Sequence, residues 1–135
     1  MTGVQTCALP IFSSEKIVET YLARIETVNP ALNAVVQLWG DGARAEAREA
    51  DAARARGEEL GPLHGVPMTI KDSLDTAGVV TTGGTKGREG FVPKQDATVV
   101  RRLREAGAIL LGKTDRKSTR LNSSHMSESR MPSSA

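Results

Sequence analysis

The 135-residue chain has little cysteine, histidine and aromatic side chain. One cysteine excludes an internal disulfide. Aromatic residues make up 3% of the chain, apolar residues 39% and charged residues 25%, which excludes collagen-like and highly charged disordered chains. No apolar run approaches the roughly 20 residues of a membrane-spanning helix. The composition therefore predicts one small globular unit with no transmembrane segment.

The two ends of the chain differ in character from its middle. Residues 115–135 are rich in serine and show neither a helical nor a strand period, which predicts a disordered tail. One reading frame of a common DNA sequencing adapter encodes most of this segment, and the reverse complement of that adapter encodes residues 1–11. We therefore expect residues 1–12 and 115–135 to be translated adapter and residues 13–114 to be the native segment.

Removing the ends changes what the charge implies. The whole chain has a net charge of +2, whereas residues 13–114 carry 14 basic and 14 acidic side chains and are neutral overall. The electrostatic argument for a nucleic-acid or membrane partner then disappears. One histidine and no cysteine remain in the native segment, so we expect no metal and no cofactor. No signal peptide precedes it, which makes the cytoplasm the expected location.

A helix followed by a short apolar run is predicted at the start of the native segment. Apolar residues follow the serine pair 13–14 at helical spacing, and the serines are typical N-cap residues. Asn29-Pro30 is the expected end of this helix, because proline disfavours a helical conformation in the residue before it. The run AVVQLW at residues 34–39 predicts a strand or a buried turn.

Two further helices have recognisable start and stop signals. Asp41 is the expected N-cap of an alanine-rich helix that continues to about Arg56 and stops at Gly57. Its apolar face is thin, which favours a surface position. Asp96 is the expected N-cap of a later helix that stops at Gly107.

The order of the elements predicts an α/β fold. Residues 68–70 read as a strand that enters Lys71, and the wholly apolar residues 108–111 read as a buried strand of a parallel sheet. A helix lies between these strands in the sequence. A strand–helix–strand crossover is the usual connection between parallel strands.

The most visible motif in the chain is misleading. Residues 107–114 fit the phosphate-binding pattern G-x-x-x-x-G-K-[ST] letter by letter. A P-loop requires a strand before the first glycine and a flexible loop before the lysine. Here a helix precedes Gly107, and the middle residues are the predicted strand itself. The sequence context therefore disfavours a P-loop, and a P-loop nucleotide-binding protein is kept only as the rival class.

Two side chains remain as candidates for chemistry. His64 stands alone in the native segment and is interpreted as structural. Lys71 ends a strand, where it is either solvated or, if desolvated, has a lowered pKa and serves as a base. Asp72 could pair with it or orient the following turn. Ser73 could form a dyad with Lys71 only if the strand continued past Lys71.

Three blocks of the native segment carry a resemblance to a known family. GPLHGVPMTIKDSLDTAGVVTTGGT at residues 61–85 and FVPKQDATVVRRLREAGAILLGKT at residues 91–114 closely resemble the amidase signature family. YLARIETVNPALNAVV at residues 21–36 is similar to the leading helix of that family. The resemblance implies N-terminal helices followed by the first strands and the crossover helix of a mixed sheet, that is, an incomplete domain.

The resemblance also implies an activity. In this family the lysine of the G-V-P-x-x-x-K-D block is the base of a Ser–cis-Ser–Lys triad that hydrolyses a carboxylic amide, and Lys71 occupies that position. The block that supplies both serines has no match in this chain, since Ser118, Ser123 and Ser124 do not fit it. The resemblance therefore implies Lys71 alone as a catalytic residue and an inactive fragment.

The expected substrate is a small-molecule amide, and the oligomeric state stays open. The A subunit of a tRNA-dependent amidotransferase, which shares these sequence blocks, is the alternative. The resemblance implies no membrane and no direct nucleic-acid partner. Residues 81–84 are expected to pack near the site as a loop.

Overall fold

A computed structural model of the chain describes residues 12–115. The described part contains three α-helices, three β-strands and one turn of 3-10 helix, η1, at Lys86–Arg88. The helices are α1 (Ser14–Leu32), α2 (Gly40–Ala55) and α3 (Thr98–Glu105), and the strands are β1 (Val35–Leu38), β2 (Pro67–Lys71) and β3 (Ile109–Thr114). The adapter and tail predictions concern residues that, apart from Phe12 and Asp115, lie outside this range.

The strands form a mixed sheet in the order β1-β3-β2. β3 is its central strand and runs parallel to β2 and antiparallel to β1. The chain passes from β2 through α3 to β3, so the predicted crossover is confirmed. The residues of β3 from Ile109 to Lys113 are buried, as expected for a strand with both faces covered.

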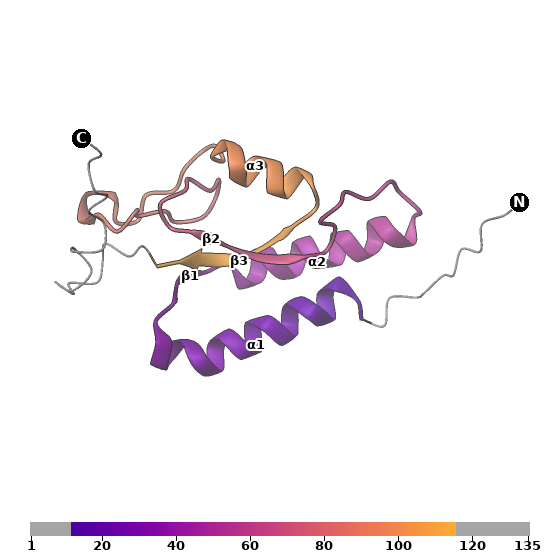
Figure 1. The fold of residues 1–135 in the computed structure, drawn as a ribbon, viewed down its shortest axis with the longest axis horizontal. Coiled ribbons are helices and arrows are strands. Elements are labelled where there is room, and N and C mark those ends of the chain that lie inside the picture. Colours follow the sequence, from indigo (N-terminus) through magenta and orange to yellow (C-terminus); the bar gives the residue numbers. More distant parts are fainter. Residues whose placement is uncertain (1–11, 116–135) are drawn as a thin grey trace, which may run out of the picture.

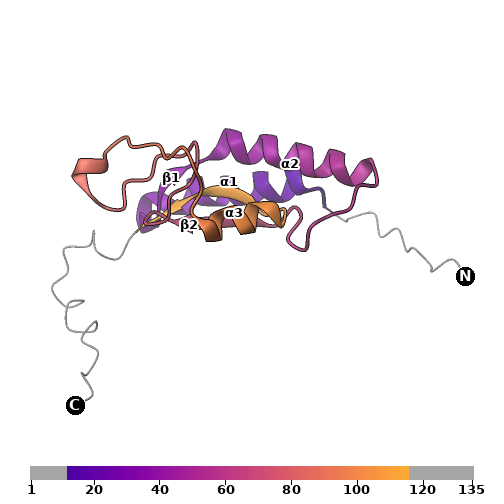
Figure 2. The same ribbon diagram turned by 90° about the horizontal axis from the view of Figure 1, so that it is seen from above.

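Helices cover both faces of this sheet. α1 and α2 lie on one side of the strands and α3 on the other (Figure 1). Figure 2, seen from above, shows α3 over the strands while α2 runs alongside them. Ile109 and Leu111 pack with α1 and α2, whereas Leu110 packs with α3 and β2. β3 therefore lies between two apolar clusters.

The first helix is longer than predicted. The side chain of Ser13 accepts a hydrogen bond from the backbone N–H of Lys16, so the predicted N-cap is confirmed. The helix passes through Pro30 and ends at Leu32, with Asn33 in the left-handed conformation (φ 49°). The prediction that Asn29-Pro30 ends the helix was wrong. Asn29 instead supports the turn that follows, because its side chain bonds to the backbone of Ala34 and Val35.

The second helix starts earlier than the sequence predicted. It begins at Gly40, and Trp39 occupies the N-cap position without a side-chain cap. The prediction of Asp41 as N-cap was wrong, because Asp41 lies inside the first turn and contacts Arg44 (3.3 Å). Gly57 follows the helix with φ +71°, consistent with the predicted stop.

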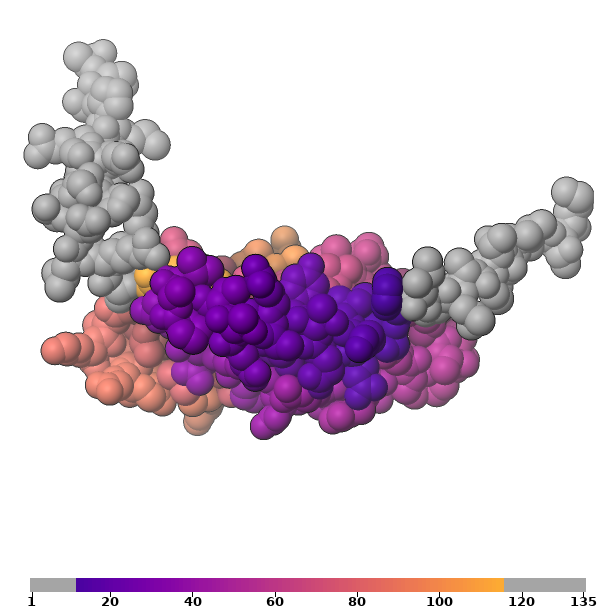
Figure 3. Space-filling view, turned by 90° about the horizontal axis from the view of Figure 1, so that it is seen from below, coloured from indigo at the N-terminus to yellow at the C-terminus, as the bar shows by residue number. Residues whose placement is uncertain are grey.

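The predicted surface position of α2 is confirmed: Arg48 and Glu49 on its outer face are exposed, and its thin apolar face is turned inward. Its alanines at positions 43, 47 and 50 are buried against α1 and β3. Alanine allows the two helices to approach closely, so a face of small side chains still contributes to the core. Figure 3 shows α1, in indigo and purple, lying across the outer side of this layer.

The third helix also lacks the predicted cap. Asp96 was expected at its N-cap, but Ala97 occupies that position and no side chain caps it. The carboxylate of Asp96 accepts a hydrogen bond from the backbone N–H of Ala77 (2.7 Å) and pairs with Arg104. The prediction was wrong because a loop distant in sequence offers this carboxylate a different N–H. Gly107 follows the helix with φ +97°, as its role as a stop requires.

Candidate functional site

The candidate site lies at the carboxyl ends of the parallel strands β2 and β3. Lys71 is the last residue of β2 and is paired in register with Thr114 of β3. The segment between β2 and α3 lies beyond these ends (Figure 1). The strand-end position predicted for Lys71 is confirmed, and its side chain is exposed among residues 12–115. A lysine that acts as a base needs a desolvated side chain, and the described residues do not bury Lys71.

Asp72 orients the turn that follows Lys71. It is buried, and its carboxylate accepts hydrogen bonds from the backbone N–H (3.2 Å) and the hydroxyl (2.6 Å) of Thr82. The backbone N–H of Asp72 donates to the carbonyl of Thr114 (2.9 Å). Of the two roles considered for Asp72, orienting the turn is the one that the geometry shows.

The Ser73 dyad is not formed. That arrangement required the strand to continue past Lys71, whereas β2 ends at Lys71 and a turn follows. In this turn the N–H of Leu74 donates to the carbonyl of Lys71 (3.0 Å). Ser73 is exposed.

The burial of Lys113 among oxygen partners was not predicted from the sequence. Its side chain is fully buried, and its ammonium group donates to the carbonyl of Leu74 and to the hydroxyls of Thr76 (2.7 Å) and Thr81 (3.2 Å). The signal was present: a lysine inside an otherwise apolar, buried strand must find oxygen partners. The phosphate-binding pattern drew attention to the same residue for another reason.

Burial lowers the pKa of Lys113, because the protein interior disfavours its charged form. The negative charges of Asp72, Asp75 and Asp96 act in the opposite direction and favour the ammonium form.

The structure removes the P-loop interpretation. A phosphate-binding loop needs backbone N–H groups that point into an open loop. Residues 109–114 are instead the central strand, whose backbone pairs with β1 on one side and β2 on the other. Lys113 is buried beneath the 72–82 loop and does not reach solvent. The rival class of nucleotide-binding protein is therefore wrong for this motif.

His64 lies at the other end of the sheet, before the amino end of β2. Its Nε2 atom is 2.8 Å from the carbonyl oxygen of Ala50 in α2. The ring thus ties the turn before β2 to α2, which agrees with the structural interpretation.

The loop at residues 81–84 packs at the candidate site, as expected. Thr81 is fully buried and contacts Lys113, and Thr82 contacts Asp72. Gly83 (φ +59°) and Gly84 (φ +70°) adopt the left-handed conformation directly after these contacts. Glycine tolerates these positive φ values, so the chain can turn immediately after the two threonines.

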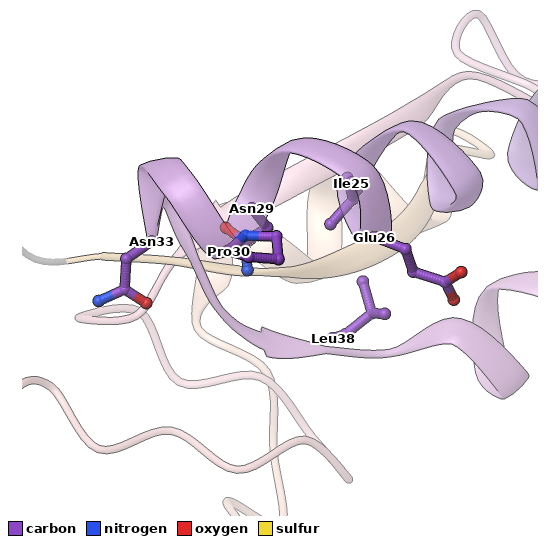
Figure 4. Close-up of a pocket in the computed structure, with 6 residues that line it drawn as sticks. All are labelled: Ile25, Glu26, Asn29, Pro30, Asn33 and Leu38. Carbon is purple, nitrogen blue, oxygen red and sulfur yellow. The ribbon is translucent and has the colours of Figure 1, made fainter.

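A separate hollow lies away from this site, between the end of α1 and β1. Figure 4 shows Ile25 and Leu38 pointing into it from opposite sides, while Glu26 and Asn33 point outward. It holds no cluster of groups suited to catalysis.

Among residues 12–115, no group of three or more His, Cys, Asp or Glu side chains is placed to hold a metal ion. No helix in this range is long and apolar enough to cross a bilayer.

Sequence comparison relates the chain to a family of known proteins. The Amidase family model matches residues 16–132. This match extends past Thr114 to residue 132, and it does not test the hypothesis that the two ends of the chain are translated adapter. The glutamyl-tRNA(Gln) amidotransferase A subunit of a Synechococcus strain is 50% identical over 103 residues, which are 76% of this chain and 21% of that protein. The corresponding A subunit of Acidothermus cellulolyticus is 48% identical over 103 residues, 76% of this chain and 20% of that protein.

Solved structures give the same picture. The peptide amidase from Stenotrophomonas maltophilia matches with a TM-score of 0.71 and 43% identity, over 76% of this chain and 21% of that one. A 6-aminohexanoate cyclic dimer hydrolase matches with a TM-score of 0.68 and 33% identity, over 80% and 21%. The predicted fold, part of a larger mixed-sheet domain, is confirmed. The chain spans about a fifth of the length of the curated relatives it matches.

Proposed function

The chain belongs to the Amidase family, and from this premise we propose that it carries the general base of an active site that hydrolyses carboxylic amides. The observation that carries the proposal is the position of Lys71 at the carboxyl end of β2, beside the parallel strand β3. Ligands of α/β sheets bind outside the carboxyl ends of the strands. An exposed lysine at that edge is available to groups contributed by the rest of the domain.

The proposed mechanism assigns one role to Lys71. In its neutral form Lys71 accepts a proton from a bridging serine, which in turn takes the proton of a second serine. The second serine attacks the amide carbonyl, and the proton returns from Lys71 through the bridging serine to the leaving nitrogen as the C–N bond breaks and the amine or ammonia departs. Water then hydrolyses the resulting ester, which releases the acid and restores the serine. Both serines belong to parts of the domain that residues 12–115 do not include. Packing of those parts over Lys71 would remove water and favour the neutral amine.

We expect the 135-residue chain alone to be inactive, because it holds the base and lacks the matching serine block. The measurement is ammonia release from small amides and peptide amides by the purified chain, with Lys71→Ala as the control. Turnover by the unaltered chain above that control would refute this expectation.

A graft tests the proposed function directly. Residues 13–114 replace the aligned segment of the Stenotrophomonas maltophilia peptide amidase, which supplies the remaining four-fifths of the domain. We expect the chimera to release ammonia from the parent enzyme's peptide amide substrate, because the family position of the base is retained. A chimera that melts as cooperatively as the parent and yet shows no turnover would contradict the proposal.

The alternative function is that of an amidotransferase A subunit. The observation that favours it is that the curated relatives at 48–50% identity are A subunits of a glutamyl-tRNA(Gln) amidotransferase. Such a protein would work with partner subunits. A second graft, into the Synechococcus A subunit, tests this alternative against the first. If the alternative holds, this graft should retain a larger fraction of its parent's activity than the peptide amidase graft does.

A further inference from the structure

The 72–82 loop is held to β3 by one buried lysine. The three hydrogens of a lysine ammonium group match three acceptors, and the structure places three oxygens around Lys113: the Leu74 carbonyl and the hydroxyls of Thr76 and Thr81. The partners come from residues 32 to 39 positions earlier in the chain. The interaction therefore joins the central strand to a loop that is distant in sequence.

The two threonine hydroxyls also form hydrogen bonds within the loop itself. The Thr76 hydroxyl donates to the carbonyl of Leu74 (3.1 Å), and the Thr81 hydroxyl donates to the carbonyl of Val79 (3.1 Å). Each hydroxyl therefore donates a hydrogen bond to a carbonyl of the loop and accepts one from Lys113 through its oxygen. Both threonines are fully buried, as is Lys113, so water does not replace the lysine in this arrangement.

The contacts lead from Lys113 to Lys71 through a single residue. Leu74 accepts from the Lys113 ammonium group through its carbonyl and donates to the carbonyl of Lys71 (3.0 Å) through its N–H. A second route passes through the adjacent threonines, because Thr81 contacts Lys113 and Thr82 holds the carboxylate of Asp72.

We propose that Lys113 is a positioning residue, whose buried side chain holds the 72–82 loop closed and thereby fixes the backbone from which Lys71 projects. This role rests on the proposed function of Lys71 as the base. It also gives the G-K-T sequence at residues 112–114 a purpose other than phosphate binding.

The first test is amide hydrogen exchange on the full 135-residue chain carrying Lys113→Met. Removing the ammonium group leaves buried oxygens without their donor, so we expect exchange at Asp72, Leu74 and Thr82 to accelerate about tenfold or more. Ile109→Val, on the same strand but in the cluster with α1 and α2, is the matched control for general destabilisation. Unchanged exchange at the three loop amides, or a rise no larger than in the control, would overturn the proposal.

A milder pair of variants covers the case in which Lys113→Met does not fold. Thr81→Val removes one of the three oxygens from the loop side, and Thr85→Val changes an exposed threonine nearby. Thr81→Val should loosen the same three amides, whereas Thr85→Val should leave their exchange at the wild-type rate. Equal effects of the two variants would count against the proposal.

The second test separates positioning from general stability. In the peptide amidase graft, Lys113→Met should lower kcat by about tenfold with little change in KM, because the base moves and the substrate contacts do not. In a Lys71→Ala background the same substitution should change kcat less than about twofold. Equal losses in both backgrounds would overturn the link to Lys71. If Lys71→Ala itself left turnover intact, the proposed function would fail, while the exchange result would still judge the loop-holding role.

Discussion

Lys71→Ala in the peptide amidase graft is expected to lower kcat/KM for amide hydrolysis by about a hundred- to ten-thousandfold. The alanine side chain cannot accept a proton, so the attacking hydroxyl would have to lose its proton to water. Lys71 is exposed at the end of β2, and its side chain makes no contribution to the apolar clusters. The loss should appear in turnover, and thermal unfolding of the variant graft measures separately what the substitution costs in stability.

Two companion variants sharpen this result. Lys94→Ala removes an exposed lysine from the segment between β2 and α3 and should leave kcat/KM at the level of the unaltered graft. Lys71→Arg keeps a positive charge but not basicity, because a guanidinium group stays protonated in proteins. It should be as inactive as Lys71→Ala. Substantial activity in Lys71→Arg would show that the charge at this position matters and that proton acceptance does not.

Gly107→Ala is expected to lower the free energy of unfolding of the 135-residue chain by about 3 kcal/mol. Gly107 has φ +97°, and an added Cβ would lie 2.7 Å from Cα and 3.0 Å from the backbone N of His64. Both atoms belong to the backbone of the turn before β2, so a side-chain rotation cannot relieve the contact. The Gly107 carbonyl also accepts a hydrogen bond from Gly65 of that turn (3.0 Å). The substitution would thus force apart the starts of β2 and β3.

Gly57→Ala is the matched control for this substitution. Gly57 also has a positive φ (+71°), but nothing lies within 4 Å of an added Cβ. Gly57→Ala should lower the free energy of unfolding by only about 1 kcal/mol, the cost of placing alanine in the left-handed conformation. Urea unfolding of both variants measures the difference. Equal losses would mean that the close approach to His64 adds nothing to the strain of the positive φ.

Some features of the candidate site follow from the order of the residues alone. The alternation of Gly, Pro and apolar residues around Lys71 predicted a strand that ends there, and the resemblance to amidases singled out this lysine. The apolar residues before Gly112 predicted a buried strand, and the intervening helix predicted its parallel pairing with β2. These predictions succeeded because they depend on period and order, which are local properties of the chain.

The hydrogen-bond partners of the aspartates could not be predicted from their local sequence. Asp41 and Asp96 both stand where an N-cap is expected, and neither caps its helix. A carboxylate bonds to whichever N–H or cation the fold brings within reach. For Asp96 that group is the N–H of Ala77, which lies 19 residues away in sequence. Asp51, inside α2, instead accepts from the first N–H groups of α1, at Ser14 and Glu15.

Hydrophobic period and turn residues act over short distances, so they were enough to predict the α/β class, the crossover from β2 to β3 and the placement of Lys71 at a strand end. The role of Lys113 depends instead on contacts between distant parts of the chain. A buried ammonium group requires oxygen partners, and those at Leu74, Thr76 and Thr81 come within reach only after the sheet has formed and the loop has closed over it.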